Sequence, residues 1–119
     1  MKVDDDSGYF GSRVVAGRFS LTYSSSMTVD ASLGNLFVIS ANNNTAFTIN
    51  APSNGVFGQR ICIMVRNTSG GALGAATWNG AFKMPAWTNP ANGNSRSPDF
   101  AYDGTNWVQI GRCDFDVPN

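Results

Sequence analysis

The side chains in this sequence that could do acid–base or metal chemistry are all aspartates. The chain has eight acidic residues, and all eight are Asp, because the sequence contains neither Glu nor His. This composition removes the commonest general base and the imidazole ligand, and it leaves no partner for a Ser–His or Cys–His pair. The Asp triplet at residues 4–6 lacks the Glu and the spacing of a calcium loop. We therefore expect no metal, no cofactor and no enzymatic activity.

The remaining carboxylates give only a weak case for a hydrolase. Asp114 and Asp116 could act as paired carboxylates, but they lie in a short tail with no visible cleft. Asp103 is followed by Gly104, and this dipeptide is typical of a tight hairpin turn. A hydrolase that uses an Asp pair is the weakest of the functional hypotheses.

The two cysteines, Cys62 and Cys113, are far apart in the sequence and form no metal-binding CxxC pair. A disulfide, two buried thiols, or contacts within an assembly would all fit them. The first ten residues, MKVDDDSGYF, are acidic where a signal peptide would be basic and then apolar. We therefore expect synthesis in the cytosol, where thiols stay reduced.

Aromatic side chains are the better lead to a binding function, and most of the large ones lie in the C-terminal half. Trp and Tyr rings stack on sugars and also anchor protein interfaces. We expect Trp107 to be a core residue, whereas Trp87 lies in a Pro- and Asn-rich loop and should be near the surface. Trp87, Asn92 and Asn94 are thus the candidate contacts to a ligand or receptor.

The charge balance narrows the class of partner. Only 13% of the residues are charged, and eight basic residues balance eight acidic ones. No net field attracts nucleic acid, and no apolar run approaches the roughly 18 residues of a membrane span. A neutral surface rich in amides and hydroxyls suits carbohydrate or another protein, although it also fits any β-rich domain with polar loops.

The clearest element is a predicted strand over residues 59–67. Ile61, Ile63 and Val65 alternate with polar or amphipathic residues, so one face should belong to the core. The opposite face carries Arg60, Cys62, Met64 and Arg66. We interpret that face as a candidate contact with a partner subunit.

About nine short strands separated by Gly, Asn and Pro turns, with no helical periodicity, predict an all-β fold. The expected architecture is a single antiparallel β-sandwich or jelly-roll-like barrel over residues 18–119. Residues 1–17 are predicted to be a short extended N-terminal arm, in which Tyr9 and Phe10 are candidate assembly contacts. A frayed terminus would explain this segment equally well.

Two hairpins and one long loop complete the prediction. Asn79-Gly80 is a type I′ signal that should join a strand ending at Trp78 to a strand at residues 81–84. The second hairpin turns either through a two-residue loop at Asp103-Gly104 or through a four-residue loop that extends to Asn106. Both registers place Phe100, Tyr102 and Trp107 on one face. Residues 87–98 form a loop that is long for a compact domain, and loops of this length tend to be functional or mobile.

Several of these features occur together in one known kind of protein. The carrying motifs are Gly58-Gln59 entering an Ile-rich strand, Asn67-Thr68-Ser69-Gly70-Gly71, Thr77-Trp78, and Tyr102-Asp103-Gly104-Thr105-Asn106-Trp107. In this order they resemble a β-module of bacteriophage virion proteins, especially the C-terminal parts of tail fibres. The resemblance runs from about Val29 to the end of the chain.

This resemblance implies a structural module, often homotrimeric, on the outside of a phage particle, and it brings no catalytic residues. The first hypothesis is therefore a virion protein of the capsid-decorating, tail or fibre kind that binds other virion proteins. The second is a tip that binds a receptor or a host-surface glycan. Such modules usually end a long protein, whereas this sequence places only a short arm before the module.

Overall fold

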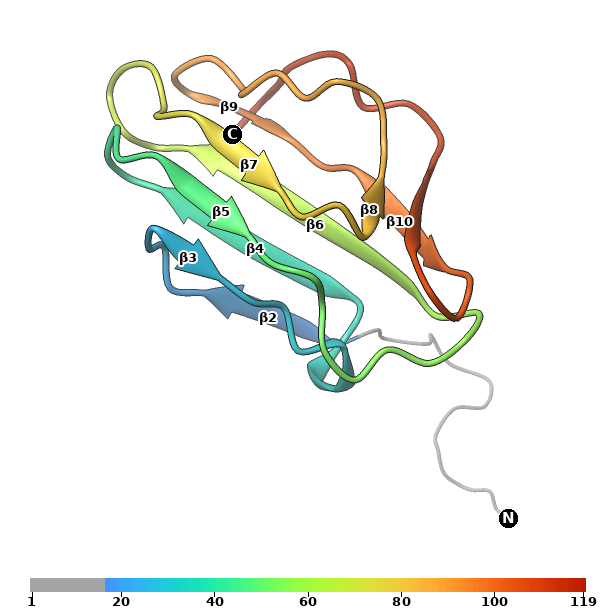
Figure 1. Cartoon of the computed structure of the whole chain (residues 1–119). Coiled ribbons are helices and arrows are strands. Elements are labelled where there is room, and N and C mark those ends of the chain that lie inside the picture. The colour runs from blue at the N-terminus through green and yellow to red at the C-terminus, as the bar shows by residue number, and fades with distance from the viewer. Residues whose placement is uncertain (1–16) are drawn as a thin grey trace, which may run out of the picture.

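The computed structural model describes residues 17–119, so the predicted arm contacts Tyr9 and Phe10 lie outside the described residues. The described part is all-β apart from one short 3-10 helix, η1 (Ala31–Leu33), as the sequence predicts (Figure 1). The first described strand starts at Arg18. The strands are β2 (Arg18–Leu21), β3 (Ser26–Met27), β4 (Leu36–Ala41), β5 (Phe47–Ile49), β6 (Arg60–Asn67), β7 (Ala76–Trp78), β8 (Phe82–Lys83), β9 (Asn94–Arg96), β10 (Asp99–Tyr102), β11 (Trp107–Ile110) and β12 (Val117–Pro118).

The first six described strands form a stack of three rungs, each made of one longer and one shorter strand. The longer strands β2, β4 and β6 pair in parallel in one sheet. The shorter strands β3, β5 and β7 pair in parallel in a second sheet. Figure 1 shows the β3-β5-β7 sheet in front of the β2-β4-β6 sheet, with the chain passing from one to the other in each rung. This arrangement resembles a short β-solenoid.

Inward-facing side chains stack in columns because the parallel registers place equivalent positions above one another. One column contains Phe19, Phe37 and Ile63. On the facing sheet, Met27, Ile49 and Trp78 occupy another. The fully buried members of these columns form the main core together with Phe100 and Trp107.

The rest of the chain closes the β6 end of the stack with antiparallel pairing. β9 pairs with the end of β6 and β10 with its beginning, in one continuous register. Pro98 interrupts this partner strand because it has no N–H to donate, but its carbonyl still accepts a hydrogen bond from Ile63 N at 3.1 Å. The sheet then continues through β11 and β8, while β12 adds to β9.

The mixed topology corrects the purely antiparallel expectation. Turn signals reveal pairing between neighbours in sequence, whereas the partners in the rungs are about 18 to 29 residues apart, as in Arg18 with Leu36 and Phe47 with Ala76. The hairpin predicted at Asn79-Gly80 is also wrong. β7 pairs with β5 there, and β8 crosses to the other sheet and pairs in parallel with β11.

The second predicted hairpin is confirmed. β10 and β11 pair with Tyr102 opposite Trp107, which leaves a four-residue turn at residues 103–106. Asp103 Oδ1 accepts hydrogen bonds from Thr105 N at 2.9 Å and from Asn106 N at 2.6 Å. The alternation of β6 is confirmed as well, since Ile61, Ile63 and Val65 are all buried.

Backbone packing at the corners of the rungs requires residues without a side chain. A Cβ at Gly34 would clash with the backbone of Gly17 in the preceding rung, and one at Gly74 would clash with residues 44–46. Glycine therefore lets consecutive rungs approach each other at these two corners.

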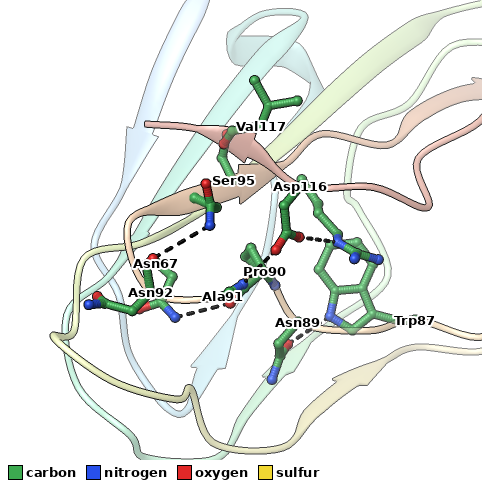
Figure 2. Close-up of polar contacts among 11 residues, drawn as sticks. Asn67, Trp87, Asn89, Pro90, Ala91, Asn92, Ser95, Asp116 and Val117 are labelled. Atoms are coloured by element: carbon green, nitrogen blue, oxygen red, sulfur yellow. Dashed lines mark hydrogen bonds and ion pairs between the residues drawn. The ribbon is translucent and has the colours of Figure 1, made fainter.

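Asn67 joins three segments at the end of β6 and is completely buried. Its Nδ2 donates to the carbonyls of Gly71 at 2.9 Å and Pro90 at 3.0 Å. Its Oδ1 accepts from Ser69 N at 3.0 Å and Ser69 Oγ at 2.7 Å. The Asn67 carbonyl also accepts from the side chain of Asn119 at 3.0 Å. Figure 2 shows Asn67 beside the segment that contains Pro90.

Candidate functional site

The outer face of the large sheet carries the predicted assembly residues of β6. Arg60 is exposed, while Cys62, Met64 and Arg66 are half-buried. Met64 and Arg66 line a shallow groove of about 370 Å³, together with Arg18 and residues of the C-terminal tail. The structure thus brings Met64 and Arg66 together at one groove, and Arg60 and Cys62 lie further along the same strand.

Cys62 is not placed for nucleophilic chemistry. Burial, followed by the nearby Asp99 carboxylate, raises the pKa of its thiol to about 12. Its Sγ lies 3.9 Å from the carbonyl oxygen of Ser97, which the thiol can reach as a donor. Burial also raises the pKa of Cys113, and both cysteines are free thiols. A protonated thiol is a weak nucleophile, so the environment of these two residues does not activate them.

The aspartates near the C-terminus are held by arginines. Arg112 contacts Asp114 at 2.6 Å, and Arg96 contacts Asp116 at 2.7 Å. These hydrogen bonds lower the pKa of both carboxyl groups. Neither carboxyl is therefore tuned to act as a general acid near neutral pH. Within residues 17–119, no group of His, Cys, Asp or Glu side chains is arranged to hold a metal ion.

Trp87 is half-buried and belongs to an aromatic cluster. Its ring packs against Trp78 with 5.0 Å between centroids, and Trp78 packs in turn against Phe82 at 5.1 Å. Trp87 Nε1 donates to Asn89 Oδ1 at 2.7 Å, as Figure 2 shows. Both contacts fix the orientation of the indole.

Asn92 and Asn94 do not share hydrogen bonds with Trp87. Asn92 is exposed, and its Oδ1 accepts from Gly70 N at 3.0 Å. Asn94 begins β9 and pairs with Pro118. The predicted loop at residues 87–98 is therefore tied to its surroundings, and it includes β9. Asp116 adds a further tie by accepting from Ala91 N at 3.1 Å (Figure 2).

Trp87 lines a pocket of about 190 Å³ between the segment after β8 and the segment after β11. Met84 contributes apolar surface, and Gln109, Arg112 and Asp114 contribute polar groups. Sequence reasoning selected Trp87 but missed these polar neighbours, because they lie more than twenty residues away along the chain. No local motif marks them.

The open end of the rung stack is a second feature that sequence reasoning missed. Among the described residues, β2 pairs only with β4, and β3 pairs only with β5. Phe19 lies at the top of an inward column, yet 42% of it is exposed, whereas Phe37 and Ile63 below it are 0% exposed. Among the described residues, no strand pairs outside this core position, and its side chain is partly exposed.

Comparison of the chain with protein-family models, curated proteins and solved structures found no match. In the described part, no helix is long and apolar enough to cross a membrane.

Proposed function

We propose that this protein is a non-enzymatic structural component of a bacteriophage particle, either a capsid-decorating protein or part of the tail or fibre. It acts by protein–protein assembly and is located on the virion. The sequence resemblance supports the phage setting. The observation that supports assembly is the open rung end, where Phe19 is 42% exposed in a column that is otherwise buried.

The open end has the properties of a strand-pairing surface. An edge strand presents unpaired N–H and C=O groups, and proteins usually block such edges with Pro, bulges or inward-pointing charges. β2 has the sequence RFSL and β3 has SM, so neither contains Pro, and the only charge is Arg18 at the start of β2. The edge is therefore suited to accept another strand.

A second copy of this chain is the partner that best fits this surface. At the opposite end of the described stack, β6 is covered by β9 and β10, whereas β7 pairs only with β5. The end at β2 and β3 is therefore the end of the described stack at which neither strand has an outer partner. Two identical ends can pair about a two-fold axis, which closes the assembly. The trimer implied by the resemblance remains a prediction, and native mass distinguishes a dimer from a trimer.

The groove beside Met64 and Arg66 is the surface we assign to other virion proteins. It combines the apolar side chains of Leu36 and Val38 with the positive charges of Arg18 and Arg66. We also propose that the fold is best described as a three-rung β-solenoid with an antiparallel cap, in place of the predicted sandwich or jelly roll.

Replacement of Phe19 by Asp tests the assembly proposal. A charge at this position would have to be desolvated in the interface. The dissociation constant of the oligomer should therefore rise at least tenfold. The measurement is native mass over a range of micromolar concentrations. Phe57→Asp is the matched control, because Phe57 is also an exposed phenylalanine, at 77%, but lies outside the rungs.

The outcomes separate the possible surfaces. Loss of oligomer in Phe19→Asp alone supports the open end. Equal loss in Phe57→Asp would place the contact elsewhere, and a wild-type chain that stays monomeric would overturn the proposal.

The predicted arm has its own test. Deletion of residues 1–16 keeps Gly17, whose carbonyl accepts from Asn35 N at 2.8 Å and Leu36 N at 3.0 Å. We expect this deletion to abolish incorporation into the particle while the fold persists, as judged by thermal unfolding. Normal incorporation would show that the arm is not a docking segment.

A further inference from the structure

The pocket beside Trp87 has no role in the assembly proposed above. It has a volume of about 190 Å³ and is walled by Met84 and Trp87 on its apolar side. Pockets that combine apolar or aromatic walls with a few convergent polar groups are the usual form of a ligand site. The packing of Trp87 on Trp78 and its hydrogen bond to Asn89 hold this wall in place before any ligand arrives.

The polar side of the pocket offers both donors and an acceptor. Arg112 and Asp114 pair through a single contact of 2.6 Å, and both side chains are largely exposed at the rim. The second carboxylate oxygen and the other guanidinium N–H groups are left for a ligand. Gln109 adds an amide that can donate and accept, and its present contact with Gly111 is a long one of 3.4 Å.

These features select a class of ligand by size, charge and shape. The ion pair cancels its own charge, so the pocket does not favour an ion. A space of about 190 Å³ admits a single six-membered ring and little more. A pyranose has an apolar C–H face and a rim of hydroxyl groups, which match an aromatic wall and a mixed donor–acceptor edge.

We propose that this pocket binds one neutral pyranose residue, with Trp87 as its apolar wall and Gln109, Arg112 and Asp114 as hydrogen-bonding partners. The site goes beyond assembly and acts independently of the open rung end. One ring in a half-open pocket makes few contacts, so the affinity for a free monosaccharide is on the order of millimolar.

The test is a titration of the intact isotope-labelled protein with glucose, galactose, N-acetylglucosamine and rhamnose, followed by amide and indole NMR signals. The three tryptophans provide an internal comparison. Saturable shifts should appear at the Trp87 indole and the Gln109 amide, and not at the indole of Trp107, which is 2% exposed. Glucuronate serves as the charged probe and should bind more weakly.

Two isosteric variants separate the pocket from the tail that carries it. Asp114→Asn removes a charge that lines the pocket, and binding should weaken at least fivefold. Asp116→Asn removes the equivalent charge of the other Arg–Asp pair, which does not line the pocket, and binding should not change. Gln109→Ala is a second pocket variant that can be used if Asp114→Asn does not fold.

The proposal is overturned if no sugar gives saturable shifts, if shifts centre on Trp107, or if both Asn variants lose binding equally. Phe19→Asp should bind sugar as the wild type does, so failure of the assembly proposal would leave this result unchanged.

Discussion

The two ends of the rung stack are built from equivalent strands but end in different surroundings. At the closed end, β6 is covered by β9 and β10, and Ile63 is 0% exposed. At the open end, Phe19 occupies the same column and is 42% exposed. Burial in this fold is thus set by whether another layer lies above a rung and not by the type of side chain alone. A partly exposed core position indicates where a bound partner would bury apolar surface.

The largest expected effect comes from shortening a side chain inside the stack. Phe37→Ala removes a ring that is 0% exposed, and the free energy of unfolding should fall by about 3–5 kcal/mol because a cavity remains. Phe19→Ala, in the same column, should cost only about 1 kcal/mol in the monomer. Urea unfolding at low protein concentration measures both values.

The comparison fails if these two variants are equally destabilised under monomeric conditions. That result would mean that Phe19 is already covered within one chain. The comparison of the two ends would instead be strengthened if Phe19→Ala lost more unfolding free energy at high protein concentration than at low concentration. Assembly would then contribute to stability.

The next effect concerns the loops at the end of β6. Asn67→Ala removes four side-chain hydrogen bonds from a buried site and leaves the Pro90 carbonyl without this donor. We expect a loss of about 2–3 kcal/mol in the free energy of unfolding. Asn92→Ala, which removes an exposed side chain and its bond to Gly70 N, should cost less than about 1 kcal/mol. Thermal or urea unfolding of the two variants compares them, and similar losses would contradict the role given to Asn67.

The effect that is smallest near neutral pH is a pH dependence that comes from Cys62. Its pKa is raised from 9.0 to about 12 in the folded chain, so the folded state resists deprotonation. The stability linked to this thiol is complete below about pH 9 and is lost as the pH rises towards 12. The slope of unfolding free energy against pH should therefore be smaller in Cys62→Ala than in the wild type. An unchanged slope would show that the thiol titrates normally.

Local patterns in the sequence predicted the elements they encode directly. The alternation over residues 59–67 gave the core face of β6, and the Asp-Gly turn gave the β10–β11 hairpin. Their signals lie within a few residues of each other. Asn79-Gly80 misled the prediction because the same dipeptide also fits a corner: Asn79 Oδ1 accepts from Ala81 N at 2.9 Å, and the chain leaves one sheet for the other.

Features that depend on contacts between distant segments could not be predicted. Parallel pairing of β2, β4 and β6 leaves no turn signal, because each return passes through the second sheet. The sequence pattern around Phe19 predicts an ordinary half-buried strand. The exposure of its side chain depends on the neighbours of β2, which in the described part pairs only with β4. Likewise, Gln109 and Asp114 meet Trp87 only through the fold. The sequence therefore predicted the wall of the pocket but not its polar side.

Amide hydrogen exchange at two protein concentrations tests the central claim most directly. If a second copy covers the open end, the amides of β2 and β3 become more protected as concentration rises, while those of β6 remain unchanged. The same gain should disappear in Phe19→Asp. The contradicting result is a chain that forms oligomers while amide exchange in β2 and β3 stays independent of protein concentration. Assembly would then not use the open end of the rung stack.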